Sequence, residues 1–350
     1  MKHLFSTLLH RSFIMASLSA TLVSCESVFD DDLPECRTEN RIVFRYDYNM
    51  KYADAFPAEV NSVKIWAFDQ QGNPVWSASE SDEALRSKDF YIECPLQPGT
   101  YDFLTWCGLE GNDSFNLLTE SPQNITQLGV DLLLKGGSRD GEISGLYSDN
   151  KFSGLYHALE KGVQIYRNPT ANETREIELS LMKDTKYVKV LLQNLDGKEM
   201  KTEDFSISIS ADDSELAYDN SVLPDTPEFR YLPWSLTGGV AEMPDGMEGT
   251  VTSVSSVLAE LSTSRLMKGA ECYLTVTRNS DGKEIIHIPF IEYLLLVKGN
   301  YRPMSDQEYL DRQDEYSLTF FLDSGLNWYS RIGIYINSWH IVPPQDTPLH

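Results

Sequence analysis

Histidine is scarce in this sequence, and no catalytic motif surrounds the few that are present. Six histidines occur among 350 residues, and those beyond the first 24 residues are His157, His287, His340 and His350. No two of them have metal-ligand spacing, and the chain contains no Gly-x-Ser-x-Gly, P-loop or zincin motif. His287 alternates with apolar residues and is expected on a strand face. The sequence therefore predicts no enzyme, no metal site and no cofactor.

Basic residues are also few relative to acidic ones. The chain has 29 Lys and Arg against 53 Asp and Glu, which gives a formal net charge of −24. This excess of negative charge argues against nucleic acid as a partner. The acidic clusters Asp30–Asp32 and Asp212–Asp213 lack the alternating spacing of a calcium-binding EF-hand. We interpret both clusters as solvated loops.

The apolar run near the N-terminus is too short to cross a membrane. It extends from Phe13 to Val23, about 11 residues against the roughly 20 that a spanning helix needs. With basic residues ahead of it, this run predicts a signal peptide over residues 1–24. Leu22-Val23-Ser24-Cys25 fits a bacterial lipobox, so Cys25 becomes the acylated N-terminus of the mature chain. An ordinary secretory signal followed by a chance cysteine is the alternative.

Cysteine is too sparse for a disulfide framework. Once Cys25 is used for lipid, four cysteines remain, and no CxxC motif supports a zinc or thioredoxin-like site. A simple hairpin between 91–96 and 101–106 places Cys94 opposite Phe103, about 13 Å from Cys107 and beyond disulfide reach. Two alternatives stay open, a bond from Cys36 to Cys94 or Cys107, or free buried thiols. The pairing of Cys272 is equally open.

Long amphipathic helices are absent from the pattern, and short strands with turn residues dominate it. From Arg41 the residues alternate, with Ile42, Phe44, Tyr46 and Tyr48 expected on one face. Hairpin signals follow at residues 60–76 around Gly72 and at 272–290 around Asp281-Gly282. Ser305 with Glu308 predicts the start of one short helix, ending near Arg312. The fold class is therefore all-β.

Chain length favours two domains, because 326 residues remain after the signal peptide. Residues 25–36 are expected to form an acidic, lipidated tether. We expect one β-sandwich over 37–172 and a second over 173–345. Val63-Lys64-Ile65 begins nine residues before Gly72, and Val188-Lys189-Val190 begins nine residues before Gly197. This repeat of strand and turn favours two related sandwiches, each of which begins with such a hairpin.

Two groups of motifs resemble a known family. The first comprises Phe44-Arg45-Tyr46-Asp47-Tyr48-Asn49-Met50, the strand from Val63, and Leu96-Gln97-Pro98-Gly99-Thr100-Tyr101 ending in Trp106. The second comprises Asp306-Gln307-Glu308-Tyr309-Leu310-Asp311-Arg312, Tyr316 to Phe321, and Ile336-Asn337-Ser338-Trp339. Together they resemble the FimB-like minor fimbrial anchor subunits of type V pili.

This resemblance implies a fold, a location and a partner. The fold would be two transthyretin-like β-sandwiches, and the protein would be anchored in the outer membrane through lipid on Cys25. The acidic run after Cys25 resembles an export signal of surface lipoproteins and favours an outward-facing location. The partner would be the pilin of the fimbrial shaft, joined by donor-strand exchange.

Tryptophans suggest an alternative function, since exposed indole rings can stack on sugars. Trp66, Trp106 and Trp339 lie in strand patterns and are expected in the core. Trp234, within Leu232-Pro233-Trp234-Ser235, is the one expected to be exposed. The alternative hypothesis is therefore a surface lipoprotein that binds glycans.

Overall fold

The computed structural model of the chain describes residues 38–139, 143–167, 173–194, 196–224, 226–244, 251–301 and 303–342. The chain divides into two compact units. The smaller comprises residues 1–39 and 167–174, and few of its residues are described. The larger comprises residues 40–166 and 175–350 and contains the architecture discussed below. The predicted signal peptide, Cys25, the tether and Cys36 lie outside the described residues.

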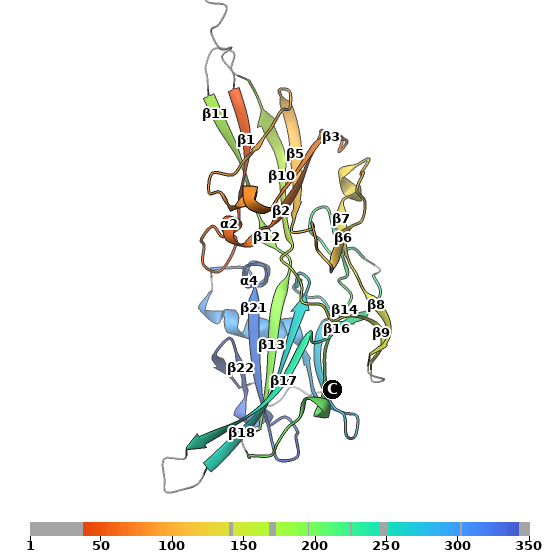
Figure 1. Ribbon diagram of the computed structural model, residues 1–350, viewed down its shortest axis with the longest axis vertical. Helices are drawn as coiled ribbons and strands as arrows, with labels where there is room; N and C mark the ends of the chain where they lie inside the picture. The colour runs from red at the N-terminus through yellow and green to blue at the C-terminus, as the bar shows by residue number, and fades with distance from the viewer. Residues whose placement is uncertain are drawn as a thin grey trace, which may run out of the picture. The chain divides into compact units, whose positions relative to one another are not determined.

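The described residues form five β-sheets, which confirms the all-β class (Figure 1). A three-stranded sheet has the order β11 (Glu173–Ser180), β1 (Thr38–Arg45), β4 (Ile92–Glu93). A five-stranded sheet has the order β12 (Met182–Lys183), β10 (Tyr156–Ile165), β5 (Gly99–Cys107), β2 (Ser62–Phe68), β3 (Pro74–Ser81). These two sheets form the N-terminal lobe of the larger unit.

Two six-stranded sheets form the C-terminal lobe. The first has the order β17 (Ser235–Pro244), β18 (Val251–Thr263), β13 (Lys186–Asn194), β21 (Glu315–Leu322), β22 (Ile334–Ile336), β23 (Trp339–Ile341). The second has the order β20 (Lys283–Pro289), β19 (Tyr273–Arg278), β14 (Phe205–Ala211), β16 (Phe229–Tyr231), β9 (Ile143–Ser148), β8 (Lys135–Arg139). A small sheet adds β15 (Glu215–Ala217), β7 (Gly129–Leu132) and β6 (Phe115–Leu117).

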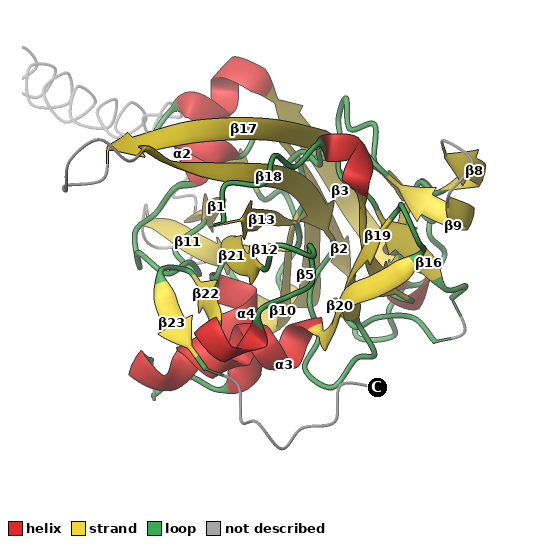
Figure 2. Ribbon diagram, turned by 90° about the horizontal axis from the view of Figure 1, so that it is seen from below, coloured by secondary structure: helices red, strands yellow, loops and turns green. Residues whose placement is uncertain are grey.

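Helices are short in the described part of the chain. The α-helices are α2 (Phe56–Glu59), α3 (Phe290–Leu295) and α4 (Asp306–Arg312). The 3₁₀ helices are η1 (Asp82–Arg86), η2 (Ile125–Gln127), η3 (Thr202–Asp204), η4 (Leu296–Asn300) and η5 (Ser330–Ile332). Figure 2 shows α3 and α4 side by side. None of the described helices is long and apolar enough to cross a membrane.

Strand β2 of the five-stranded sheet is buried on both faces. Ile65 and Phe103 belong to the core of the N-terminal lobe, whereas Trp66 and Trp106 belong to the core that fills the C-terminal lobe. Alternate residues of a strand point to opposite faces, so a strand buried on both sides reads as a continuous apolar run. The sequence of β2, Ser-Val-Lys-Ile-Trp-Ala-Phe, is such a run. The expectation that Trp66 and Trp106 lie in the core is confirmed.

Several local predictions are confirmed. In β1, Ile42 and Phe44 are buried and alternate with partly exposed residues, as expected. β2 and β3 form an antiparallel hairpin, and Gly72 in its turn has a φ of +80°. β19 and β20 form the second predicted hairpin. α4 begins after Ser305, whose side chain accepts a hydrogen bond from the Glu308 N–H at 3.0 Å.

The predicted hairpin between 90–96 and 101–106 is wrong. β4 pairs instead with β1, through Ile42 opposite Ile92, while β5 pairs with β2 and β10. Pro95 and Pro98 lie between the two strands and cannot donate backbone hydrogen bonds, which explains why pairing does not continue there. The register that set Cys94 opposite Phe103 therefore does not form.

The second half of the proposed repeat is also not a hairpin. Gly197 has a φ of +76°, as a turn requires. The strand before it, β13, pairs with β18 and β21, and the strand after it, β14, lies in the other six-stranded sheet. Strands from both sides of residue 172, the predicted end of the first sandwich, also share sheets. β11 and β12 join the N-terminal lobe, and β8 and β9 join a sheet of the C-terminal lobe.

Candidate interaction surfaces

The last described strand, β23, lies at an open sheet edge. It pairs with β22 through Ile334–Ile341, Tyr335–His340 and Ile336–Trp339, and no described strand pairs with its other side. The turn between them places Asn337 and Ser338 at positive φ, which is typical of a type I′ hairpin. We call the β22–β23 hairpin, residues 334–341, the C-terminal edge.

Apolar side chains are exposed along the C-terminal edge. Trp339 lies opposite the fully buried Ile336 but is 50% exposed, and Val342 beyond it is 53% exposed. The expectation that Trp339 lies in the core is therefore wrong, because no described strand lies outside β23 to cover it. Exposed, unpaired edges are normally protected by charge, proline or short length. β23 is short, with three residues, yet it carries the exposed indole of Trp339 and is followed by the exposed Val342.

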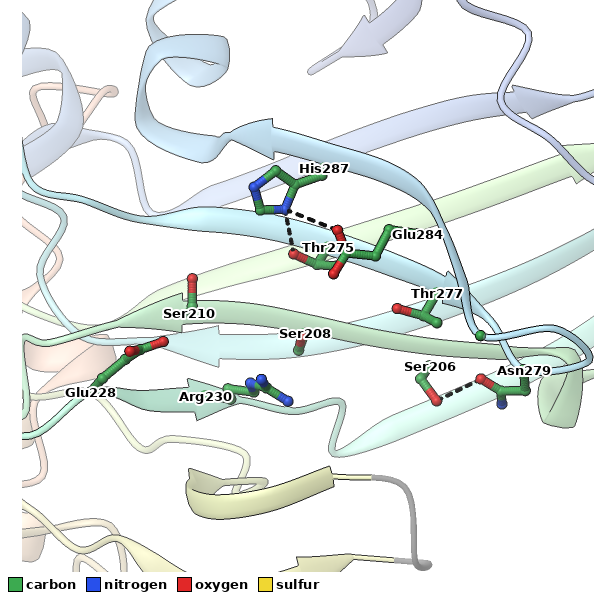
Figure 3. Close-up of a pocket in the computed structure, with 11 residues that line it drawn as sticks. Ser206, Ser208, Ser210, Glu228, Arg230, Thr275, Thr277, Asn279, Glu284 and His287 are labelled. Carbon is green, nitrogen blue, oxygen red and sulfur yellow. Dashed lines mark hydrogen bonds and ion pairs between the residues drawn. The ribbon is translucent and has the colours of Figure 1, made fainter. Parts of the chain in front are cut away.

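A polar trough lies on the second six-stranded sheet (Figure 3). Its volume is about 400 Å³, and its floor is formed by hydroxyl groups on β14 and β19, namely Ser206, Ser208, Ser210, Thr275 and Thr277. Longer side chains line its rim, namely Glu228, Arg230, Asn279, Glu284 and His287. The intervening residues, such as Ile207 and Ile209, point into the core. The trough follows from the alternation of small hydroxyl and apolar residues along these strands.

His287 is held in place at the rim of the trough. Its ring stacks on Tyr273, with centroids 4.9 Å apart and an interplanar angle of 5°. Its Nδ1 lies 3.0 Å from the Thr275 hydroxyl and 3.9 Å from the Glu284 carboxylate (Figure 3). The expectation of a strand-face histidine is confirmed. The trough can offer many hydrogen bonds to a polar ligand.

A charged junction connects the two lobes where the chain passes from β12 to β13. We define the junction as Tyr46, Asp47, Tyr48, Asn49 and Tyr52 on one side and Arg265, Asp311, Arg312 and Asp314 on the other. The Tyr46 hydroxyl donates to Asp314 at 2.6 Å. Arg312 lies over the rings of Tyr48 and Tyr52, at 3.9 and 4.6 Å from their centroids. It also donates to the backbone carbonyls of Asp47 and Asn49, each at 3.4 Å.

Helix α4 is fixed to the C-terminal lobe by a buried ion pair. Arg265 donates from Nε and Nη2 to the two carboxylate oxygens of Asp311, at 2.8 and 2.9 Å. Both side chains are buried. Lys186 donates to the Asp311 backbone carbonyl at 2.7 Å, and Gln307 donates to its carboxylate at 2.9 Å. Burial lowers the pKa of Lys186, and Asp314 and Asp311 oppose that effect.

Two further buried carboxylates lie in the C-terminal lobe. Asp184 accepts from Asn220 at 2.8 Å, and burial raises its pKa to about 7 although nearby Arg265 opposes the rise. Asp213 accepts from the Tyr231 hydroxyl at 2.8 Å, and burial likewise raises its pKa to about 7. The interpretation of Asp212–Asp213 as a solvated loop is therefore wrong for Asp213, since its carboxylate points inward to a hydroxyl partner.

The described cysteines and Trp234 have no arrangement that suggests chemistry. Among the described residues, Cys94, Cys107 and Cys272 are buried free thiols, whereas Cys36, which the disulfide alternative requires, lies outside the described residues. Trp234 is half-buried, and the Lys151 ammonium lies 4.8 Å from its ring centroid. One face of the ring is thus occupied. Within the described residues, no group of three or more His, Cys, Asp or Glu is placed to hold a metal.

Comparison with known proteins identifies the family. The family model for fimbrillin-A associated anchor proteins Mfa1 and Mfa2 matches residues 33–343. The chain belongs to the fimbrillin-A associated anchor family. Membership confirms the resemblance to fimbrial anchor subunits, and it places the protein among fimbrial components of the cell surface. No curated protein matches this chain.

Solved structures agree with this membership. A candidate adhesin from Bacteroides thetaiotaomicron has 31% identity and a TM-score of 0.74, covering 89% of this chain and 99% of its own. A candidate polysaccharide-binding protein from the same organism has 26% identity and a TM-score of 0.69, covering 88% and 99%. The fimbrial anchor protein Mfa2 from Porphyromonas gingivalis has 19% identity and a TM-score of 0.61, covering 88% and 99%, and so shares the fold.

Proposed function

We propose that this protein anchors a fimbrium to the outer membrane, and ends the fibre at its base, through lipid on Cys25 and strand addition at the C-terminal edge. Family membership supports a role in a fimbrium. The observation that carries the proposal is the open β23 edge, on which Trp339 is half exposed although it lies opposite a fully buried isoleucine. Such an edge is suited to receive another strand.

Strand addition would use both the backbone and the side chains of β23. An extended segment of the shaft pilin would pair with the free N–H and C=O groups of the edge. It would also cover Trp339 and Val342, which are the apolar groups left exposed there. The opposite edge of the same sheet, β17, is less suited, because Gly238, Gly239 and Pro244 interrupt its side chains and donors.

Binding to the purified shaft pilin tests the edge contact. Trp339→Lys places a charge where the proposal needs an apolar contact, and loss of a central tryptophan commonly weakens an interface by 2 kcal/mol or more, about thirtyfold in Kd. Val75→Lys is the matched control, because Val75 is 44% exposed on another edge strand, β3. Equal binding by the two variants would remove the C-terminal edge from the proposal.

Membrane fractionation tests the lipid anchor. Replacing Cys25 with alanine removes the thiol that would carry the acyl chains, so the variant should leave the membrane fraction and appear in the soluble fraction. Detergent partitioning of the wild type provides the control. A variant that stays with the membrane would contradict lipid attachment at Cys25.

A second candidate function is glycan binding in the polar trough. The specific observation is the floor of five hydroxyl groups between longer polar side chains, since sugars are recognised through many hydrogen bonds. One neighbour of similar fold is described as a candidate polysaccharide-binding protein. Calorimetric titration with neutral oligosaccharides tests this function. Ser208→Leu places a larger side chain on the floor of the trough and should abolish the heat of binding. Absence of binding heat with the wild type would exclude glycan binding in the trough.

A further inference from the structure

The two motifs that carry the family resemblance meet at the charged junction, although about 260 residues separate them. Arg312 of the second motif contacts Asp47, Tyr48 and Asn49 of the first. We propose that the junction is a mechanical lock that passes tension directly from β1 to β21. The proposal rests on the proposed function, because only a protein held between membrane and fibre is under tension.

The positions of the contacts define a short path for force. β1 is the first described strand after the predicted tether, and it ends at Arg45, next to Tyr46. β21 begins at Glu315, next to Asp314. The hydrogen bond between Tyr46 and Asp314 therefore joins the end of one strand to the start of the other. From β21 the sheet continues through β22 to the C-terminal edge.

The lock has components that resist separation. The Tyr46 hydroxyl donates to a carboxylate, and a hydrogen bond to a charged acceptor is stronger than one between neutral groups. The Arg312 guanidinium is held by aromatic faces as well as by carbonyls, which combines cation–π attraction with hydrogen bonding. The Tyr46 hydroxyl binds the residue before β21, and Arg312 binds the residues that continue β1.

Helix α4 transfers the tension from the lock to the body of the C-terminal lobe. Arg312 ends α4, and the carboxylate of its neighbour Asp311 accepts from Nε and Nη2 of Arg265 at 2.8 and 2.9 Å. Lys186, at the start of β13, donates to the Asp311 carbonyl. β13 runs parallel to β21 over eight residue pairs. Tension that reaches Arg312 is thus spread over two paired strands of one sheet.

The lock has a consequence for the strands between β1 and β13. Without it, tension on β1 would peel that strand from the N-terminal lobe, whose strands lie within Thr38–Cys107 and Tyr156–Lys183, roughly 100 residues in all. Unravelling these two segments would add roughly 340 Å of extended chain. With the lock closed, the same tension bypasses the other strands of the N-terminal lobe, and that lobe opens only after the junction has failed.

Optical-tweezers unfolding of the full mature chain, pulled from both termini, tests this path. Arg312→Met should lower the force of the first unfolding event and add separate opening of the N-terminal lobe, by about 340 Å in total. Arg86→Met is the matched control, because Arg86 also donates to two backbone carbonyls, those of Pro57 and Ala58, but within the N-terminal lobe. That control should leave the force and the number of steps unchanged.

A second variant covers the case in which Arg312→Met does not fold. Tyr46→Phe removes only the hydroxyl that reaches Asp314 and should lower the first unfolding force in the same direction. If both lock variants unfold at the force and in the steps of Arg86→Met, the junction is ordinary packing and the proposal is wrong. The pulling measurement uses purified protein, so its result is independent of whether fibres need this protein in cells.

Discussion

Replacing Arg265 with methionine should destabilise the protein strongly. The guanidinium makes two charge-assisted hydrogen bonds to Asp311, and only 10% of the Arg265 side chain and 5% of the Asp311 side chain are exposed. Methionine fills much of the volume but leaves the Asp311 carboxylate buried without its counter-charge. Removing one partner of a buried ion pair costs about 3–5 kcal/mol, whereas an exposed pair contributes about 0–1 kcal/mol.

Urea unfolding followed by tryptophan fluorescence measures this loss. The free energy of unfolding, extrapolated linearly to water, should fall by about 3–5 kcal/mol in Arg265→Met. The double variant Arg265→Met with Asp311→Leu removes both charges and should recover most of the loss, because a buried pair can be replaced by apolar groups at little cost. A loss below about 1 kcal/mol in the single variant would refute the buried-pair interpretation.

Three further predictions follow from single residues. Because burial raises the pKa of Asp213 to about 7, the folded chain keeps a proton that the unfolded chain releases near pH 4, so this group's stabilisation is complete below pH 4 and is lost as pH rises to 7. Asp213→Asn lacks this titration, so its free energy of unfolding should rise relative to that of the wild type by up to about 4 kcal/mol between pH 4 and 7.5. Parallel pH curves for the two proteins would contradict this. Gly108→Ala should cost at least about 2 kcal/mol in urea unfolding, because φ is +84° and a Cβ would lie 1.9 Å from the Gly154 carbonyl oxygen; an unchanged midpoint would show that the turn can rearrange. Burial raises the pKa of the Cys107 thiol to about 12, so a thiol reagent at pH 8 should label it only after denaturation, and rapid labelling of the native protein would contradict its burial.

Local structure was predictable where the signal lies within a few residues. The alternation through Ile42 and Phe44, the glycine at position 72 and the Ser305 cap each specify a conformation through neighbouring atoms. The pairing of β4 with β1 was not predictable in this way, because its partner lies about 50 residues earlier in the chain. A sequence pattern gives the faces of a strand but not the strand beside it.

The candidate site shows the same limit. The motif ending in Asp311-Arg312 was recognisable, but its role depends on Arg265 and on Asp47 and Asn49, which are distant in sequence. Trp339 has the residue pattern of a core strand, and only its place at the end of the sheet exposes it. Asp213 looks like a loop acid beside Asp212, and only the Tyr231 hydroxyl explains its burial.

Fibre retention in cells tests the central claim most directly. Strains with the gene, without it, and with the Cys25→Ala form would be compared by electron microscopy and by blotting the medium for pilin. An anchor that also ends the fibre predicts long fibres shed into the medium from the strain without the gene. It predicts shed fibres from the Cys25→Ala strain, whose C-terminal edge is intact, and attached fibres of ordinary length only with the wild-type gene. Fibres that stay attached and unchanged in the strain without the gene would contradict the claim.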